Sequence, residues 1–233
     1  MSIRAVFFDL GGTLLVMRRD RIFRRVLKEE GRDASIERIH SAYTGLEGWW
    51  LEAYSSRVMT PEQTEDAYRH LDEVVFTKLF PSESPSVAFD VSRLVRKRWP
   101  ELEGEIPLEL YPDVHPTLTK LARGGFSMGL ISNAPADTDQ VVESLGLTKF
   151  LGSVIISGAV GYSKPHPEIF RMALRDLDVP PEEAIHVGDV YEADVVGARN
   201  AGMNGLLIDR EGAQPIFDCP CMKSLDEIFQ YIG

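Results

Sequence analysis

Short apolar segments that end in polar or glycine residues alternate with amphipathic segments through the second half of the chain. The apolar segments cover residues 127–131, 153–156, 184–187 and 205–208, and helical patterns lie between them over 137–145, 167–177 and 193–201. Strands that alternate with helices in this way pair in parallel, and the crossover helices cover both faces of the sheet. The pattern therefore predicts a doubly wound α/β domain, with 205–208 as its last strand.

A strand of the same kind is predicted near the start of the chain. The residues AVFF at 5–8 end at Asp9, and Gly11, Gly12 and Thr13 follow. This is the pattern of a buried parallel strand that runs into a tight turn. The next strand-like segment begins only near residue 127, so we expect an all-helical insertion of roughly ninety residues after the first strand.

Helical periodicity predicts several helices between the first and second strands. The expected ranges are 18–30, 36–57, 61–80, 89–99 and, just before the second strand, 118–123. Thr60, Pro61 and Gln63 have the residue types of an N-cap, a first helical position and a capping box. Pro100 is expected to end the helix before it.

Acidic residues outnumber basic ones in this chain. The 36 Asp and Glu against 25 Lys and Arg give a formal net charge of −11. Such a surface repels phosphate backbones and anionic lipids, so neither a nucleic acid nor a membrane is an expected partner. No apolar stretch approaches the roughly 20 residues of a membrane-spanning helix, and the N-terminus lacks the apolar region of a signal peptide.

The two cysteines, Cys219 and Cys221, are separated by one residue. A disulfide between them would be strained, and a metal site would need more ligands. We therefore expect two free thiols in a reducing compartment, and a soluble, cytoplasmic protein. The oligomeric state stays open, with a homodimer among the alternatives.

Polar residues gather at the predicted carboxyl ends of the strands, where ligands bind in sheets of this kind. These residues are Asp9, Gly11, Thr13, Ser132, Asn133, Lys164, Asp189 and Asp194. Carboxylates that converge repel one another unless a cation neutralises them, and oxygen ligands suit Mg²⁺. A lysine, a hydroxyl and backbone N–H groups could then hold phosphate oxygens. The set is suited to phosphoryl transfer to an aspartate nucleophile.

Four stretches of the chain resemble, in order and position, the motifs of the haloacid dehalogenase superfamily of hydrolases. They are FFDLGGTL (7–14), LISNA (130–134), SKPHPEIF (163–170) and HVGDVYEAD (186–194). Four ordered motifs on predicted strand ends are far more specific than one alone. The resemblance implies a Rossmann-like core over residues 1–16 and 108–233, and a helical cap over 17–107 between the first two motifs. The cap is similar in position and helical character only.

The resemblance also implies roles for the motif residues. It implies that Asp9 and Lys164 are catalytic, with Asp9 as the nucleophile, and that Ser132, Asn133 and Lys164 bind phosphate. It implies that Asp9, the Gly11 carbonyl and Asp189 are ligands of Mg²⁺. Thr13 and Asp194 would support these ligands from behind. His186 is interpreted as a core or hydrogen-bonded histidine rather than a ligand. Trp49 or Trp50 of the cap could line the substrate pocket, although packing is the simpler interpretation.

Gly11 departs from the pattern of the family's phosphatases. These enzymes usually have an aspartate two residues after the nucleophile, as general acid and then general base, and Gly11 has no side chain to do either. General acid–base catalysis is typically worth about 10²–10⁴ in rate. The departure therefore bears on activity and not on the fold.

The leading hypothesis is a Mg²⁺-dependent phosphatase of a small phosphorylated metabolite. A metal-independent haloacid dehalogenase would accommodate Gly11, but the resembled dehalogenases lack the acid at Asp189. A phosphonate-cleaving enzyme would need a Schiff-base lysine from the cap, where Lys28, Lys78 and Lys97 are the candidates. A catalytically weak binding or regulatory module is the remaining alternative.

Overall fold

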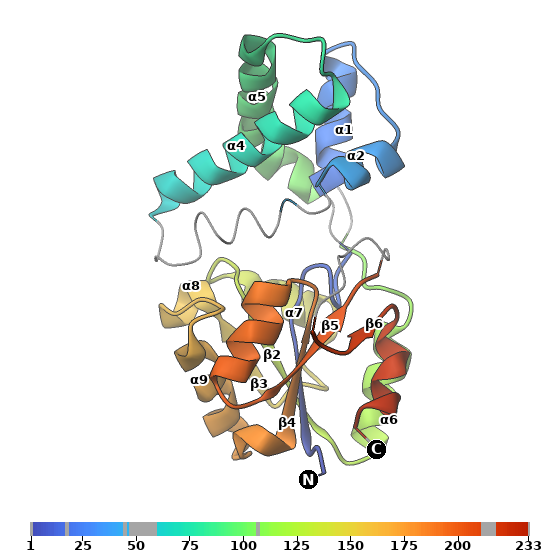
Figure 1. The fold of residues 1–233 in the computed structure, drawn as a ribbon, viewed down its shortest axis with the longest axis vertical. Helices are drawn as coiled ribbons and strands as arrows, with labels where there is room; N and C mark the ends of the chain where they lie inside the picture. Colours follow the sequence, from blue (N-terminus) through green and yellow to red (C-terminus); the bar gives the residue numbers. More distant parts are fainter. Residues whose placement is uncertain are drawn as a thin grey trace. The chain divides into compact units, whose positions relative to one another are not determined.

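The computed structural model describes residues 2–16, 19–43, 46, 60–105, 108–210 and 218–232. The chain forms two compact units (Figure 1). One comprises Met1–Val16 together with Leu108–Gly233, and the other comprises Met17–Pro107. No helix among the described residues is both long and apolar enough to cross a membrane.

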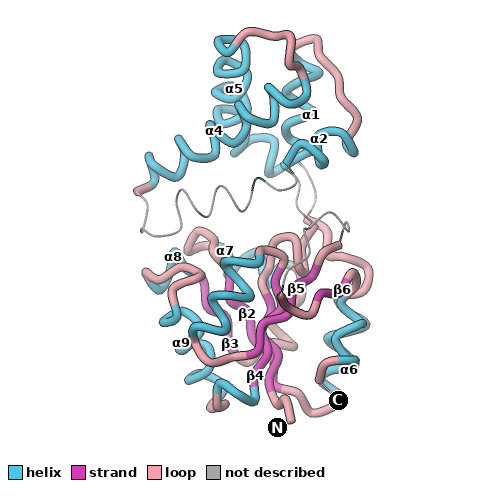
Figure 2. The backbone as a smooth tube through the Cα atoms, viewed as in Figure 1, coloured by secondary structure: helices cyan, strands magenta, loops and turns pink. Residues whose placement is uncertain are grey.

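The first unit contains a parallel sheet of six strands in the order β3-β2-β1-β4-β5-β6. The strands, magenta in Figure 2, are β1 (Ala5–Phe8), β2 (Ser127–Ser132), β3 (Ser153–Ile156), β4 (Ala184–Gly188), β5 (Asn204–Ile208) and β6 (Cys221–Met222). All four residues of β1 are buried because this strand lies between β2 and β4. The predicted doubly wound α/β fold is confirmed.

Helices cover both faces of this sheet. They are α6 (Val114–Arg123), α7 (Thr138–Ser144), α8 (Ser157–Val160), α9 (Pro167–Leu177), α10 (Gly197–Asn200), the 3₁₀ helices η1 (Pro181–Glu183) and η3 (Leu225–Gln230), and the π-helix η2 (Tyr191–Val196). Val6 and Phe8 join one hydrophobic cluster with α6, α7 and η3, whereas Ala5 and Phe7 join another with α9 and α10. Figure 1 shows α6 and α9 on opposite sides of the sheet.

Three predictions about this unit need correction. The strand 205–208 is not the last one, because β6 pairs with β5; its two residues are too few to leave an apolar run in the sequence. Helix α6 begins at Val114 rather than at 118, since Pro116 lies in its first turn, where proline is tolerated. The helix predicted over 193–201 is instead η2 followed by α10.

The second unit consists of helices in its described part. They are α1 (Arg19–Glu29), α2 (Ile36–Tyr43), α4 (Pro61–Leu79) and α5 (Pro85–Glu105), and they bury one hydrophobic cluster. The predicted capping box is confirmed: Gln63 N–H donates to the Thr60 hydroxyl at 3.2 Å, and Thr60 N–H donates to Gln63 Oε1 at 3.0 Å. Most of the helix predicted over 36–57, with Trp49 and Trp50, lies outside the described residues.

The prediction that Pro100 ends a helix is wrong, because α5 continues through it to Glu105. A proline inside a helix costs about 3 kcal/mol, since it removes a backbone hydrogen bond and crowds the preceding turn. Leu102, which follows it, is 1% exposed in the cluster of this unit. Its burial contributes about 1.5–3 kcal/mol and offsets much of that cost.

A buried ion pair gives a first testable consequence. Asp72, 1% exposed, lies 3.0 Å from Arg96 Nε and accepts a hydrogen bond from the Tyr43 hydroxyl at 2.7 Å. Asp72→Asn would leave the Arg96 guanidinium without its counter-charge, so we expect a loss of roughly 3–5 kcal/mol in unfolding free energy by urea denaturation. Asp90→Asn, an exposed change on α5, is the control. A loss below about 1 kcal/mol for Asp72→Asn would contradict the expectation.

Candidate active site

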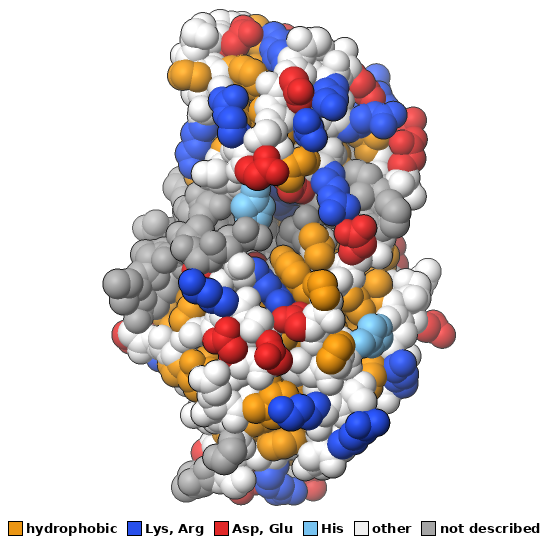
Figure 3. Space-filling view, turned by 90° about the vertical axis from the view of Figure 1, so that its right-hand side faces the viewer, with side chains coloured by type: hydrophobic (Ala, Val, Ile, Leu, Met, Phe, Trp, Pro, Cys, Tyr) orange, Lys and Arg blue, Asp and Glu red, His pale blue; other side chains and the backbone are white. Residues whose placement is uncertain are grey.

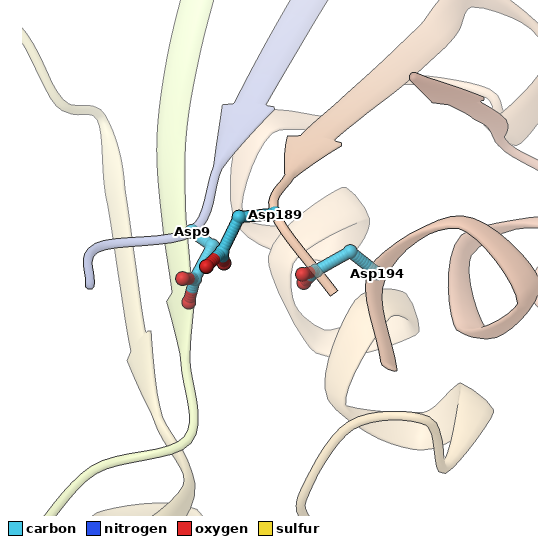
Figure 4. Close-up of side chains that lie close together, drawn as sticks. All are labelled: Asp9, Asp189 and Asp194. Carbon is cyan, nitrogen blue, oxygen red and sulfur yellow. The ribbon is translucent and has the colours of Figure 1, made fainter. Parts of the chain in front are cut away.

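Three carboxylates meet at the carboxyl ends of the two central strands. Asp9 follows β1 and Asp189 follows the neighbouring β4, while Asp194 comes from η2. One oxygen from each of the three lies within 4.8 Å of the other two. Figure 4 shows the Asp9 and Asp189 carboxylates side by side, with the Asp194 carboxylate directed toward them.

Two glycines make room for these carboxylates. Gly12 has a φ of 74°, and a Cβ there would lie 2.1 Å from Asp189 Oδ2. A Cβ on Gly188, the last residue of β4, would lie 2.0 Å from Asp194 Cγ. Any other residue at either position would displace a carboxylate, so the backbone itself shapes the site. Gly11 does not share the positive φ of Gly12.

Lys164 lies among these acids and is 3% exposed. Its ammonium donates to Asp9 Oδ1 at 2.6 Å and to Asp194 Oδ1 at 2.6 Å. Its main chain is held by the side chain of Asn133, which accepts from Lys164 N–H at 2.7 Å and donates to the Lys164 carbonyl at 2.9 Å. Lys164 is therefore fixed at both ends, although its side chain is a flexible one.

Asp194 receives three hydrogen bonds. Besides Lys164, its Oδ1 lies 2.9 Å from His186 Nε2, and its Oδ2 accepts from Val190 N–H at 3.0 Å. His186 is thus a buried, hydrogen-bonded histidine of β4, as its position in the sequence indicated. Its partner could not be read from the sequence.

Burial and charge shift the pKa values of these groups in different directions. Burial, reinforced by the charge of Asp194 and opposed by Lys164, raises the pKa of Asp9 to about 6. For Asp194, the Lys164 charge and the hydrogen bonds from His186 and Lys164 outweigh burial and hold the pKa well below its usual range. The two carboxylates likewise outweigh burial at Lys164 and raise its pKa. Burial lowers the pKa of His186, so the ring is neutral at pH 7.

The site concentrates acidic groups. Three carboxyl groups gather here, and the Lys164 ammonium is shared between two of them, Asp9 and Asp194. Carboxylates crowded in this way repel one another, and the charge of Asp194 adds to the larger effect of burial in raising the pKa of Asp9. A divalent cation would balance this charge, and oxygen ligands are those that Mg²⁺ takes.

The remaining predicted residues lie around these carboxylates. Ser132, 4% exposed, is the last residue of β2, the strand beside β1. Gly11 forms an isolated β-bridge with Leu15 in the loop after Asp9. Thr13 is fully buried in the same loop, and its carbonyl accepts a hydrogen bond from Arg210 Nη2 at 2.6 Å. The structure thus places all the predicted motif residues in the first unit, on its strands and in the segments that follow them.

Two contacts of the site escaped the sequence analysis. Arg210 holds the loop after β1, and 197 residues separate it from Thr13. The side-chain amide of Asn133 holds the Lys164 main chain across 31 residues, and its role in phosphate binding stays a prediction. No local pattern reveals a side chain that bonds so far along the chain.

The chain is similar in sequence to known hydrolases. It matches the family of haloacid dehalogenase-like hydrolases over residues 3–202. It is 34% identical over 223 residues to glyceraldehyde 3-phosphate phosphatase from Methanopyrus kandleri, covering 89% of this chain and 84% of that protein. It is 41% identical over 107 residues to phosphoserine phosphatase from Thermus thermophilus, which covers 46% of this chain and 43% of that protein.

A solved structure supports the same relationship at the level of the fold. The HAD-hydrolase YfnB from Bacillus subtilis, bound to magnesium, aligns with a TM-score of 0.69 over 100% of this chain and 99% of that one. The two sequences are 16% identical, so this likeness concerns the fold alone. The family match over residues 3–202 and the 34% identity to the Methanopyrus kandleri protein show the family itself. The chain belongs to the haloacid dehalogenase-like hydrolases.

Proposed function

We propose that this hydrolase is a Mg²⁺-dependent phosphatase that cleaves a small phosphorylated metabolite through an aspartyl-phosphate intermediate. The observation that carries the proposal is the meeting of Asp9, Asp189 and Asp194 beside the Lys164 ammonium. The names of the relatives from Methanopyrus kandleri and Thermus thermophilus, both phosphatases, support the same reaction class. In this proposal residues 1–16 and 108–233 are the catalytic core, and residues 17–107 are the cap that selects the substrate.

The chain's own residues support two displacement steps. An Asp9 carboxylate oxygen attacks phosphorus and the bond to the leaving-group oxygen breaks, so the phosphoryl group is transferred to Asp9. Water then attacks the same phosphorus, the bond to Asp9 breaks, and inorganic phosphate leaves. Lys164, held against Asp9 at 2.6 Å, would orient the nucleophile and balance charge on the phosphoryl oxygens. Ser132 would add a hydroxyl contact to them.

The residues present fit a magnesium ion. Asp9 and Asp189 offer carboxylate oxygens on adjacent strand ends, and Gly12 leaves space for the Asp189 carboxylate that a Cβ would fill. We propose Asp9, the Gly11 carbonyl and Asp189 as its ligands. Asp194 would support them from behind, where it accepts a hydrogen bond from Lys164. The bound ion would neutralise the nucleophile and the phosphate and polarise the phosphoryl oxygens.

The surface is consistent with a small-molecule substrate. On the face drawn in Figure 3, Lys and Arg side chains are interspersed with Asp and Glu side chains over the described residues, without a large patch of one sign. Together with the net charge of −11, this disfavours a polyanionic partner. We propose that the enzyme acts in the cytoplasm.

Removal of the metal tests the proposal. Hydrolysis of p-nitrophenyl phosphate should be lost after EDTA treatment and return with Mg²⁺. Asp189→Asn should raise the Mg²⁺ concentration for half-maximal activity by roughly 10- to 100-fold or more, because a charged ligand is lost. Asp178→Asn, an exposed change after α9, should leave it unchanged.

The same assay separates the competing functions. Full activity after EDTA treatment would overturn the proposal that the enzyme depends on Mg²⁺. Release of chloride from 2-chloropropionate without metal would instead support the dehalogenase, which Gly11 accommodates. Binding of phosphorylated metabolites with no turnover of any of them would favour a binding module.

A further inference from the structure

His186 is a buried polar ring whose neighbours across the sheet are not polar. It is fully buried in the middle of β4, and its register neighbours are Phe7 on β1 and Gly205 on β5. The Phe170 ring of α9 meets it edge-on with centroids 5.2 Å apart. Burial of a polar group without a partner costs roughly 1–3 kcal/mol, so an aliphatic residue would serve packing better here. What an aliphatic residue could not provide at this position is the hydrogen bond to Asp194.

That contact defines which ring nitrogen carries the proton. Nε2 lies 2.9 Å from Asp194 Oδ1, whereas the buried Nδ1 has no hydrogen-bond partner among the described residues. A neutral imidazole has one donor nitrogen and one acceptor nitrogen. Because an ionised carboxylate only accepts, the proton belongs on Nε2, and His186 donates to Asp194.

The acceptor of this hydrogen bond also receives the site lysine. Asp194 Oδ1 accepts hydrogen bonds from both His186 Nε2 and Lys164 Nζ. Val190 N–H donates to the other oxygen, Oδ2, at 3.0 Å. His186 and Val190 thus hold one carboxylate oxygen each, which stops the group from rotating about its terminal bond. A carboxylate fixed in this way gives the Lys164 ammonium one position, 2.6 Å from Asp9 Oδ1.

We propose that His186 is a positioning residue, which orients the Asp194 carboxylate and through it fixes the Lys164 ammonium against Asp9. The inference rests on the proposed function, because it gives the fixed ammonium its use in phosphoryl transfer. His186 itself touches neither Asp9 nor any proposed metal ligand in the described contacts. Its effect should therefore pass through Asp194.

Two substitutions at His186 separate positioning from packing. His186→Leu removes the donor, and His186→Gln places an amide N–H near the position of Nε2. We expect kcat on p-nitrophenyl phosphate to fall by about 10- to 100-fold in the leucine variant, with KM within about threefold, because a displaced catalytic group lowers the rate of the chemical step. The glutamine variant should recover kcat to within about threefold of wild type. Equal kcat in the leucine variant and wild type, or equal losses in both variants, would overturn the proposal.

A double-mutant cycle tests whether His186 acts through Asp194. In an Asp194→Asn background, His186→Leu should change kcat by less than about twofold, since the two residues act as one unit. The full 10- to 100-fold loss in that background would show that His186 acts elsewhere, and would overturn the proposal.

A measurement on the unaltered protein keeps the inference separate from activity and from the folding of variants. Nitrogen-15 NMR of labelled histidine should show His186 as the neutral tautomer with the proton on Nε2. A proton on Nδ1 would overturn the proposal, because Nε2 could not then donate to Asp194. If the wild type hydrolyses no phosphate ester but shows the Nε2–H tautomer, the proposed function fails while the contact between His186 and Asp194 is upheld.

Discussion

Replacing Asp9 with asparagine is expected to reduce kcat on p-nitrophenyl phosphate by about 10⁴- to 10⁶-fold, the range seen when a covalent nucleophile is removed. The amide has nearly the shape of the carboxylate, so the loop after β1 should keep its structure. It can still accept from Lys164, but it cannot attack phosphorus. Mass spectrometry of the acid-quenched wild type should detect a phosphoryl adduct on Asp9, and the variant should show none.

Asp226→Asn is the matched control for this experiment. It makes the same chemical change at an exposed position of η3 in the same unit, and activity should remain within about twofold of wild type. Near-native turnover in Asp9→Asn would show that another group is the nucleophile. It would also remove the main reason for placing Lys164 and Asp189 in the mechanism.

The sequence predicted the positions of β1, β3 and β4 because each is a short, mostly apolar and mostly buried run. β1 and β3 have the predicted bounds, 5–8 and 153–156, and β4 extends one residue beyond the prediction. The site residues follow these runs because parallel strands end at one edge of the sheet. Lys164 and Asp9, 155 residues apart, meet at that edge.

Contacts that depend on tertiary packing could not be predicted in the same way. Pro100 is accommodated inside α5, where Leu102 is buried, and β6 is defined only by its pairing with β5. His186 bonds to Asp194, which lies in the π-helix η2 where an ordinary helix was expected. In each case the deciding contact comes from another part of the fold.

Gly11 remains the feature that most distinguishes this site from that of the phosphatases it resembles. A glycine cannot protonate a leaving group, so we expect kcat/KM to depend steeply on leaving-group pKa. Acyl and aryl phosphates should be favoured over alkyl phosphates, because their leaving groups depart without a proton. A rate that is flat across leaving-group pKa would show that another residue supplies the acid.

Gly11→Asp should supply the missing group. The left-handed φ of 74° belongs to Gly12, so an aspartate at position 11 avoids the strain that a side chain in that region would bring. Turnover of alkyl phosphates should then rise, by up to the 10²–10⁴ or so that general acid–base catalysis gives. Gly11→Asn has nearly the same size without the acid, so it should show no such gain. If Gly11→Asp folds normally and gains nothing on any phosphate, the missing acid does not limit this protein, and a role other than phosphate ester hydrolysis would be favoured.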